Sequence, residues 1–154
     1  MHDFILVKTN EEYASAAALF NEYATWLGID LSFQRFEEEL IQIKSMYAAP
    51  LGGIILCKIM DEYVGCVAIR EQEYEVAELK RMYVKPGAQN KGIGNALLQE
   101  AILLAKKYMY KKIRLDTLSD MAPAIKLYRK SGFYSIPAYY FNPQKRAVYF
   151  EKSL

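Results

Sequence analysis

The sequence predicts a single α/β or α+β domain over residues 1–154, in which a mixed β-sheet is covered by helices. Segments whose apolar residues recur at spacings of three and four alternate with short segments rich in β-branched and aromatic residues. The length of 154 residues suits one domain with one continuous core. Hydrophobic residues make up 53% of the chain and charged residues 25%, which is typical of a globular protein.

The first part of the chain reads as a strand and two helices. After a strand at residues 3–8, a helix is predicted over residues 10–26, with Asn10 as its N-cap and Gly28 as its end. A second helix is predicted over residues 32–48, where Ser32 is a weak cap. Its apolar face is formed by Phe33, Phe36, Leu40, Ile43 and Tyr47.

The rest of the chain alternates strands and helices. A hairpin of residues 54–60 and 63–73 is predicted to turn at Asp61-Glu62, and another strand follows at residues 76–84. The remaining predicted elements are a long helix, a strand, a short helix that ends at Gly132, and two final strands, at residues 92–110, 112–118, 123–131, 133–136 and 147–152.

Composition excludes several classes of protein. A net charge of +2 is too small for a nucleic-acid-binding surface, so no nucleic-acid partner is expected. No apolar run approaches the ~18 residues that cross a membrane, and the N-terminus lacks the layout of a signal peptide. We therefore expect no membrane partner and a location in the cytoplasm.

Two cysteines and one histidine are too few for a disulfide framework or a metal site, so no metal is expected. If the hairpin turns at Asp61-Glu62, Cys57 and Cys66 lie directly opposite each other on paired strands. A disulfide is then conceivable. The favoured interpretation is that the two cysteines are small apolar residues packed side by side in a reducing compartment.

The segment with the clearest chemistry is Gln89-Asn90-Lys91-Gly92-Ile93-Gly94, which lies between a strand and the long helix. A helix that starts at a glycine-rich turn presents free backbone N–H groups and a partial positive charge, which suit a phosphate. A P-loop would need Gly-x-x-x-x-Gly-Lys-Ser/Thr, which is missing from the sequence. A dinucleotide fingerprint would need a third glycine where Leu97 stands.

The chain resembles the GCN5-related N-acetyltransferase (GNAT) superfamily, whose Gln/Arg-x-x-Gly-x-Gly/Ala signature is matched by Gln89, Gly92 and Gly94. Residues 78–86 look like the fourth strand of that superfamily, and residues 124–133 resemble its later Ala-x-x-Leu-Tyr-x-x-x-Gly-Phe segment. The resemblance covers nearly the whole chain. It implies a mixed, mostly antiparallel twisted sheet of about six to seven strands, flanked by about four helices.

The resemblance also implies that acetyl-CoA is the acyl donor. The strand that ends at Val84 would carry a bulge and splay away from the strand at residues 112–118, and the pantetheine arm would bond to main-chain groups near Met82 and Val84. The diphosphate would bind at the glycine-rich helix start. The residues expected to bind the cofactor are therefore Met82, Val84, Gln89, Asn90, Lys91, Gly92, Ile93, Gly94 and Asn95.

Direct attack of an amine on a thioester requires two proton transfers. An amine with a pKa near 10 is only about one part in 10³ neutral at pH 7, so a general base helps. Glu78 aligns with the strand glutamate that several members use as base, although an ion pair with Lys80 is the alternative interpretation. Tyr128 matches the usual general acid, and the alternative is a core tyrosine. Asp116 is a weaker candidate, interpreted as structural.

The resemblance predicts an enzyme that moves an acetyl group directly to the amine of a small molecule or amino-acid-like acceptor. A peptide or protein amine, and a non-catalytic acyl-CoA sensor, stay open as alternatives, as does a homodimer. Many members carry Asn where this chain has Met121, so a polar contact there is in doubt. A candidate acceptor lining is formed by Tyr23, Trp26, Phe33, Tyr139, Tyr140 and Phe141, with Arg35 as a candidate carboxylate partner.

Overall fold

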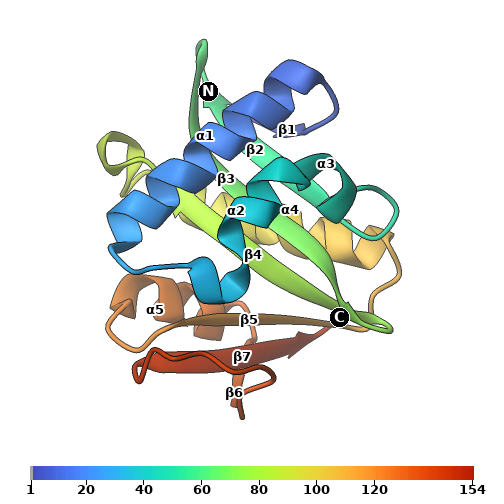
Figure 1. Cartoon of the computed structure of the whole chain (residues 1–154), viewed down its shortest axis with the longest axis vertical. Coiled ribbons are helices and arrows are strands. Elements are labelled where there is room, and N and C mark those ends of the chain that lie inside the picture. The colour runs from blue at the N-terminus through green and yellow to red at the C-terminus, as the bar shows by residue number, and fades with distance from the viewer. Residues whose placement is uncertain (1) are drawn as a thin grey trace.

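The computed structural model describes residues 2–154 (Figure 1). Within these residues seven strands form one sheet, namely β1 (His2–Leu6), β2 (Gly53–Ile59), β3 (Glu62–Glu73), β4 (Val76–Val84), β5 (Lys112–Leu118), β6 (Tyr134–Ile136) and β7 (Ala147–Ser153). The helices are α1 (Asn10–Leu27), α2 (Phe36–Ile41), α3 (Ile43–Met46), α4 (Ile93–Lys107) and α5 (Ala122–Lys130), with 3₁₀ turns η1 (Ser32–Gln34) and η2 (Pro86–Ala88).

The strand order is β1-β2-β3-β4-β5-β7-β6, and every neighbouring pair is antiparallel except β4 and β5. The predicted mixed, mostly antiparallel sheet of six to seven strands is confirmed. The described residues hold five α-helices rather than about four, because residues 32–48 do not form one helix. None of these helices is long and apolar enough to cross a membrane.

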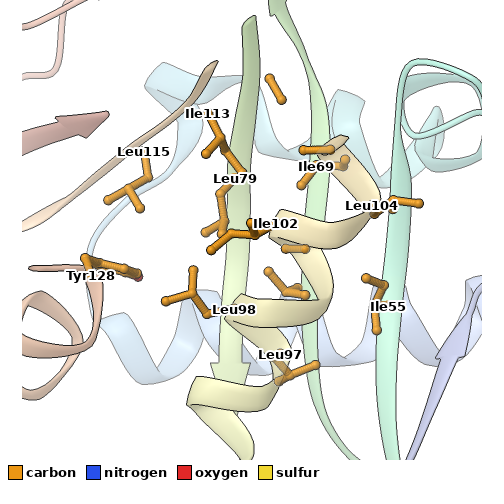
Figure 2. Close-up of a cluster of buried hydrophobic side chains, with 14 of the residues drawn as sticks. Ile55, Ile69, Leu79, Leu97, Leu98, Ile102, Leu104, Ile113, Leu115 and Tyr128 are labelled. Carbon is orange, nitrogen blue, oxygen red and sulfur yellow. The ribbon is translucent and has the colours of Figure 1, made fainter. Parts of the chain in front are cut away.

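A separate hydrophobic core lies on each face of the sheet. On one face, α4 packs Leu97 and Leu98 among side chains of the central strands such as Ile69 and Leu79, and α5 adds Tyr128 to the same cluster (Figure 2). On the opposite face, α1, α2 and α3 cover the sheet (Figure 1) with a second cluster that contains Phe20. β4 runs between the two cores, so its alternating side chains face different helices.

The N-cap of α1 is Thr9, one residue before the predicted Asn10. The Thr9 hydroxyl accepts a hydrogen bond from the Glu12 amide at 3.1 Å, and the Glu12 carboxylate accepts one from the Thr9 amide at 2.9 Å. This reciprocal capping box satisfies two N–H groups that the first turn would otherwise leave free. Gly28 ends the helix at φ 71°, as predicted.

The single helix predicted over residues 32–48 is wrong. The segment forms η1, α2 and α3 in succession, because Arg35 adopts the left-handed conformation at φ 56° and Gln42 also leaves helical geometry. Ser32 makes no capping hydrogen bond with its side chain. The break turns α2 so that Glu39 is buried against the sheet, with an exposed fraction of 1%.

The hairpin of β2 and β3 turns at Met60 and Asp61, one residue earlier than predicted. Met60 takes the left-handed conformation at φ 55°, and a register shift follows Cys57. As a result Cys57 pairs with Gly65 rather than with Cys66, and the two buried thiols belong to opposite cores. The predicted face-to-face cysteines are therefore wrong. The other predicted elements are present, with bounds that differ by at most three residues.

Candidate active site

β4 and β5 run side by side over only their first residues. Their parallel register extends from Val76–Lys112 to Glu78–Arg114. Beyond that point β4 stays paired with β3, whereas β5 stays paired with β7 as far as Leu118. The two central strands therefore part, and the splay that the resemblance implied is present.

A cavity of about 140 Å³ lies where these strands separate. β4 lines it with residues 79–84, and β5 contributes residues 116–118. α5 contributes Ala124 and Tyr128, while α1, η1 and the segment that joins them form the facing wall. Four segments that are distant in the sequence thus meet around one space at the edge of the parallel strand pair.

β4 carries a bulge at the cavity. Cys66 pairs with Tyr83 and Ala68 pairs with Lys80, so two residues of β4, Arg81 and Met82, face one residue of β3. Arg81 lies in the left-handed region at φ 59°, where a side chain other than glycine costs about 1–3 kcal/mol. Such a conformation persists only when its surroundings hold it in place. The implied bulge is therefore present, and Met82 lines the cavity beside it.

A buried ion pair holds the bulge. The Arg81 guanidinium donates to both carboxylate oxygens of Glu39, from Nε at 3.0 Å and from Nη2 at 2.8 Å. The Tyr47 hydroxyl donates to the same carboxylate at 2.9 Å, and the Phe36 ring lies 5.1 Å from the guanidinium carbon. Burial alone would raise the pKa of Glu39, but the hydrogen bonds and charge of Arg81 outweigh it and lower that pKa.

The sequence interpretation missed Glu39, although one signal was available. Glu39 lies three residues after Phe36 and four before Ile43, so it belongs to the apolar face of the predicted helix. A glutamate on such a face needs a buried partner, because an unpaired charge in a core is strongly unfavourable. Arg81 is that partner, from a strand 42 residues further along the chain.

The glycine-rich loop leads into α4 without a side-chain cap. Gly92 is the N-cap at φ 80°, and no side chain of the described residues bonds to the first turn of α4. An added Cβ at Gly92 would meet no atom within 4 Å, so the space in front of the helix start is open. The Gln89 side chain donates to the Val84 carbonyl at 3.0 Å, which ties the loop to the end of β4. Asn90 is left-handed at φ 63°.

The other predicted loop residues divide by exposure. Lys91 and Asn95 are exposed, whereas the Ile93 side chain is buried in the core and leaves only its backbone to face the loop. Gly94 sits over α5, where an added Cβ would lie 3.7 Å from Leu127. Val84 and Gln89 line the cavity, so the loop and the cavity are continuous.

Tyr128 lines the cavity and is 5% exposed. Its ring packs edge-on against Phe133 and tilts toward Phe150, at centroid distances of 5.8 and 6.3 Å. Its hydroxyl has no hydrogen-bond partner among residues 2–154. Burial, and then the charges of Tyr23 and Asp116, raise the pKa of this phenol, so it keeps its proton at neutral pH.

Glu78 lies at the last parallel pair of β4 and β5, but it is enclosed. Its carboxylate accepts a hydrogen bond from Tyr139 at 2.8 Å and one from Arg70 at 3.3 Å, and the Lys80 ammonium lies 3.8 Å away. Its side chain is 4% exposed, and Glu78 is absent from the cavity lining. Asp116, which the sequence interpretation ranked lower, does line the cavity.

The predicted acceptor aromatics do not all meet. Tyr23, Trp26 and Phe33 line the cavity, together with Met121 from the start of α5. Tyr139 and Tyr140 form a second aromatic group, whose ring centroids are 5.4 Å apart. Phe141 is 82% exposed and absent from the lining, and Arg35 points outward in an ion pair with Glu38. The lining also includes Gln34 and Asn142, which the sequence interpretation did not single out.

A mixed sheet whose one parallel pair splays beside a glycine-rich helix start defines an acyltransferase fold, and the comparisons with known proteins agree. A model of the Acetyltransferase (GNAT) family matches residues 13–133. A Schizosaccharomyces pombe protein described as an uncharacterized N-acetyltransferase is 33% identical over 147 residues, with 93% of this chain and 89% of the relative covered. The chain belongs to the GNAT acetyltransferase family, and it is an N-acetyltransferase.

Solved structures share the fold over the full length. A GNAT-family acetyltransferase from Staphylococcus aureus Mu50 superposes with a TM-score of 0.81 at 20% identity, over 99% of both chains. One from Elizabethkingia anophelis with acetyl-CoA bound has a TM-score of 0.68 at 20% identity, over 99% of this chain and 98% of the other. At these identities the likeness concerns the fold.

Proposed function

We propose that the protein transfers an acetyl group from acetyl-CoA directly to the amine of a small or amino-acid-like acceptor. The observation that carries this proposal is the continuity of an open, uncapped helix start with a cavity at the strand splay. An anion bound at the helix start and a chain laid along β4 would bring a thioester to the cavity.

The residues present fit a coenzyme A molecule. The backbone N–H groups from Gln89 to Asn95 would hold its diphosphate, and Lys91 would add charge. The main chain at Met82 and Val84, freed from β5 by the splay, would bond to the pantetheine arm. When bound, acetyl-CoA supplies a thioester carbonyl for the amine to attack, and a backbone N–H at the bulge suits polarisation of that carbonyl.

The protons would pass through side chains at the cavity. Tyr128 would give its proton to the leaving thiolate, for which its unpartnered hydroxyl on a residue of the cavity lining is suited. A carboxylate would take a proton from the amine, and Glu78 is the residue that the sequence predicts for this step.

A cysteine-bound intermediate has no support. Cys57 and Cys66 are buried and absent from the cavity lining. Burial raises the pKa of both thiols, and the Cys66 thiol donates to the Arg81 carbonyl at 3.2 Å. These observations support the proposed direct transfer from acetyl-CoA to the amine.

The proposal is tested by thiol release from acetyl-CoA across a panel of small amines, amino acids and peptide N-termini. We expect amine-dependent release of coenzyme A with small or amino-acid-like acceptors. If only peptides cause release of coenzyme A, the acceptor is a peptide amine rather than a small molecule. A rise in melting temperature with coenzyme A, but no release with any amine, would favour an acyl-CoA sensor.

Gly92→Val is expected to weaken coenzyme A binding by ~10²-fold or more, measured by calorimetry. A β-branched side chain is disfavoured at φ 80°, and its methyl groups would project into the open space before α4. Gly87→Val is the control, because an added Cβ there also meets no atom within 4 Å but the backbone is not left-handed. Equal binding by both variants would remove the loop from the cofactor site.

A further inference from the structure

The cavity contains a carboxylate, that of Asp116, which has no role in the proton transfers proposed so far. Asp116 lies on β5 two residues beyond Arg114, the last residue paired with β4, and it lines the cavity. We infer that Asp116, rather than Glu78, binds the acceptor ammonium group and removes its proton, and that Gln34 makes a second contact that favours a primary over a secondary amine. This inference rests on the proposed function, because it assigns one step of the same transfer.

Two hydrogen bonds fix the Asp116 carboxylate on one side only. Oδ2 accepts from the Tyr140 hydroxyl at 2.5 Å and from the Asn142 amide nitrogen at 3.2 Å. Oδ1 has no hydrogen-bond partner among residues 2–154. A carboxylate that is oriented through one oxygen and has the other oxygen free, on a cavity wall, is arranged to accept a proton from a ligand.

The hydrogen bonds also orient Gln34. Its amide nitrogen donates to the Tyr140 hydroxyl at 3.0 Å, and that hydroxyl gives its own proton to Asp116. The amide oxygen of Gln34 is therefore the end that stays free. Within residues 2–154 it is the one buried side-chain polar atom without a hydrogen-bond partner. Buried polar atoms are normally satisfied, so this oxygen calls for a donor from a ligand.

The free oxygens of Asp116 and Gln34 define the acceptor group. Both side chains line the cavity and contact the same Tyr140 hydroxyl, so they lie close together. A primary ammonium group has three N–H bonds, of which one can point to Asp116 and another to Gln34. A secondary amine would place a carbon substituent against one of these oxygens and leave it unpaired.

Glu78 is less suited to the same task. One of its carboxylate oxygens already accepts from Tyr139, and the other faces Arg70 and Lys80. A proton on Glu78 would leave the charges of Arg70 and Lys80 without their carboxylate partner in an enclosed environment, which is costly. Glu78 would instead balance the charge of Lys80 beside the cavity.

The bond changes balance. An N–H bond of the ammonium breaks as an O–H bond forms on Asp116, and the neutral amine then bonds to the thioester carbon. The carbon–sulfur bond breaks, the thiolate takes the Tyr128 proton, and the nitrogen, now bonded to the acyl carbon, loses a second N–H proton to solvent. Asp116 releases its proton to solvent and Tyr128 regains one, so the net result is an amide, a thiol and one released proton.

Several charged and titratable groups surround Asp116. Burial raises the pKa of Asp116, while the Tyr140 hydrogen bond and the Lys80 charge oppose that rise. The groups that face it come from β4, α1, α5, the segment before β7 and β7 itself, namely Glu78, Lys80, Arg81, Tyr23, Tyr128, Tyr139, Tyr140 and Tyr149. Replacing different neighbours should therefore shift the pKa of Asp116 in opposite directions, and the pH dependence of the rate should shift with it.

The test is the pH dependence of kcat/KM for a primary amine found in the panel, with protein concentration and coenzyme A affinity checked for each variant. On the acid side, kcat/KM should rise with pH as Asp116 loses its proton, and this rise is the acid limb of the profile. Asp116→Asn is expected to lower kcat/KM by ~10²-fold at neutral pH and to remove that limb. Tyr140→Phe should move that limb to higher pH, because the carboxylate loses a hydrogen bond. Glu78→Gln should move it to lower pH, because a nearby negative charge is lost.

Asp120→Asn is the matched control. Asp120 is on the exposed turn after β5, where it pairs with Arg146, and its replacement should change neither rate nor profile. The titration of the acceptor amine is common to all variants and cancels in the comparison. A merely structural Asp116 would lower activity without these opposite shifts of the limb.

Two results would overturn the inference. One is an unchanged rate and profile in Asp116→Asn while the wild type is active. The other is loss of the limb in Glu78→Gln with its retention in Asp116→Asn. Wild-type protein that releases no thiol with any amine would instead refute the proposed function. The acceptor class is tested with N-methyl analogues, which should react ~10-fold or more slowly, and Gln34→Met should reduce that preference.

Discussion

Glu39→Ala is expected to lower the free energy of unfolding by about 3–5 kcal/mol. The replacement leaves the Arg81 guanidinium buried without its two charge-assisted hydrogen bonds, and the Tyr47 hydroxyl without its acceptor. It also releases the strained bulge of β4, so coenzyme A affinity and turnover should fall with stability. Thermal and urea denaturation measure the loss, against a total stability of about 5–15 kcal/mol for a typical domain.

Glu38→Ala provides the matched control. Glu38 is the neighbouring glutamate on α2, and its ion pair with Arg35 is exposed to solvent, so its loss should cost at most about 1 kcal/mol. Replacing both buried partners, as in Glu39→Leu with Arg81→Met, should recover much of the lost stability, because neither charge is left unpaired. A Glu39 variant as stable as the Glu38 variant would contradict the assigned role.

The same ion pair predicts a pH dependence of stability. The pKa of Glu39 is lowered in the folded protein from its ordinary value of 4.5. The carboxylate therefore contributes its full stability above that value, and the contribution is lost as the pH falls through the lowered folded pKa. Wild-type protein should lose stability on acidification more steeply than Glu39→Gln does.

Tyr128→Phe is expected to lower turnover by ~10²-fold or more while coenzyme A affinity stays nearly unchanged. The lost hydroxyl has no hydrogen-bond partner among residues 2–154, so its removal leaves no other group unsatisfied. The aromatic contacts with Phe133 and Phe150 are retained. The comparison therefore isolates proton donation to the leaving thiolate, and steady-state kinetics together with calorimetry measure it.

Tyr108→Phe controls for the loss of a tyrosine hydroxyl. Tyr108 caps the far end of α4, away from the cavity, and its replacement should leave turnover unchanged. An equal rate for Tyr128→Phe and wild type would assign Tyr128 to the core of α5 and remove it from the mechanism.

The sheet could be predicted from the sequence because its signals are local. The strands and the helices α1, α4 and α5 follow from apolar spacing and from turn residues within each segment. Residues 32–48 could not, because the apolar spacing there fits an unbroken helix as well as a broken one. The left-handed turn at Arg35 is stabilised by contacts that α2 makes through Glu39 with a distant strand.

Part of the candidate site could likewise be predicted from local sequence, and part of it could not. The glycine-rich loop and Tyr128 lie in short motifs, so their positions could be predicted. The hairpin turns one residue earlier than predicted, and the register shift after Cys57 puts Cys57 and Cys66 on opposite faces. The environment of Asp116 depends on Gln34, Tyr140 and Asn142, which come from separate segments. No local pattern contains that arrangement.

The most direct test compares calorimetric binding of coenzyme A with binding of pantetheine, which has the same arm but no diphosphate. If main-chain amides at the start of α4 hold the diphosphate, coenzyme A should bind and pantetheine should bind at least ~10²-fold more weakly. Equal affinities for the two ligands, or no binding of coenzyme A, would contradict the account.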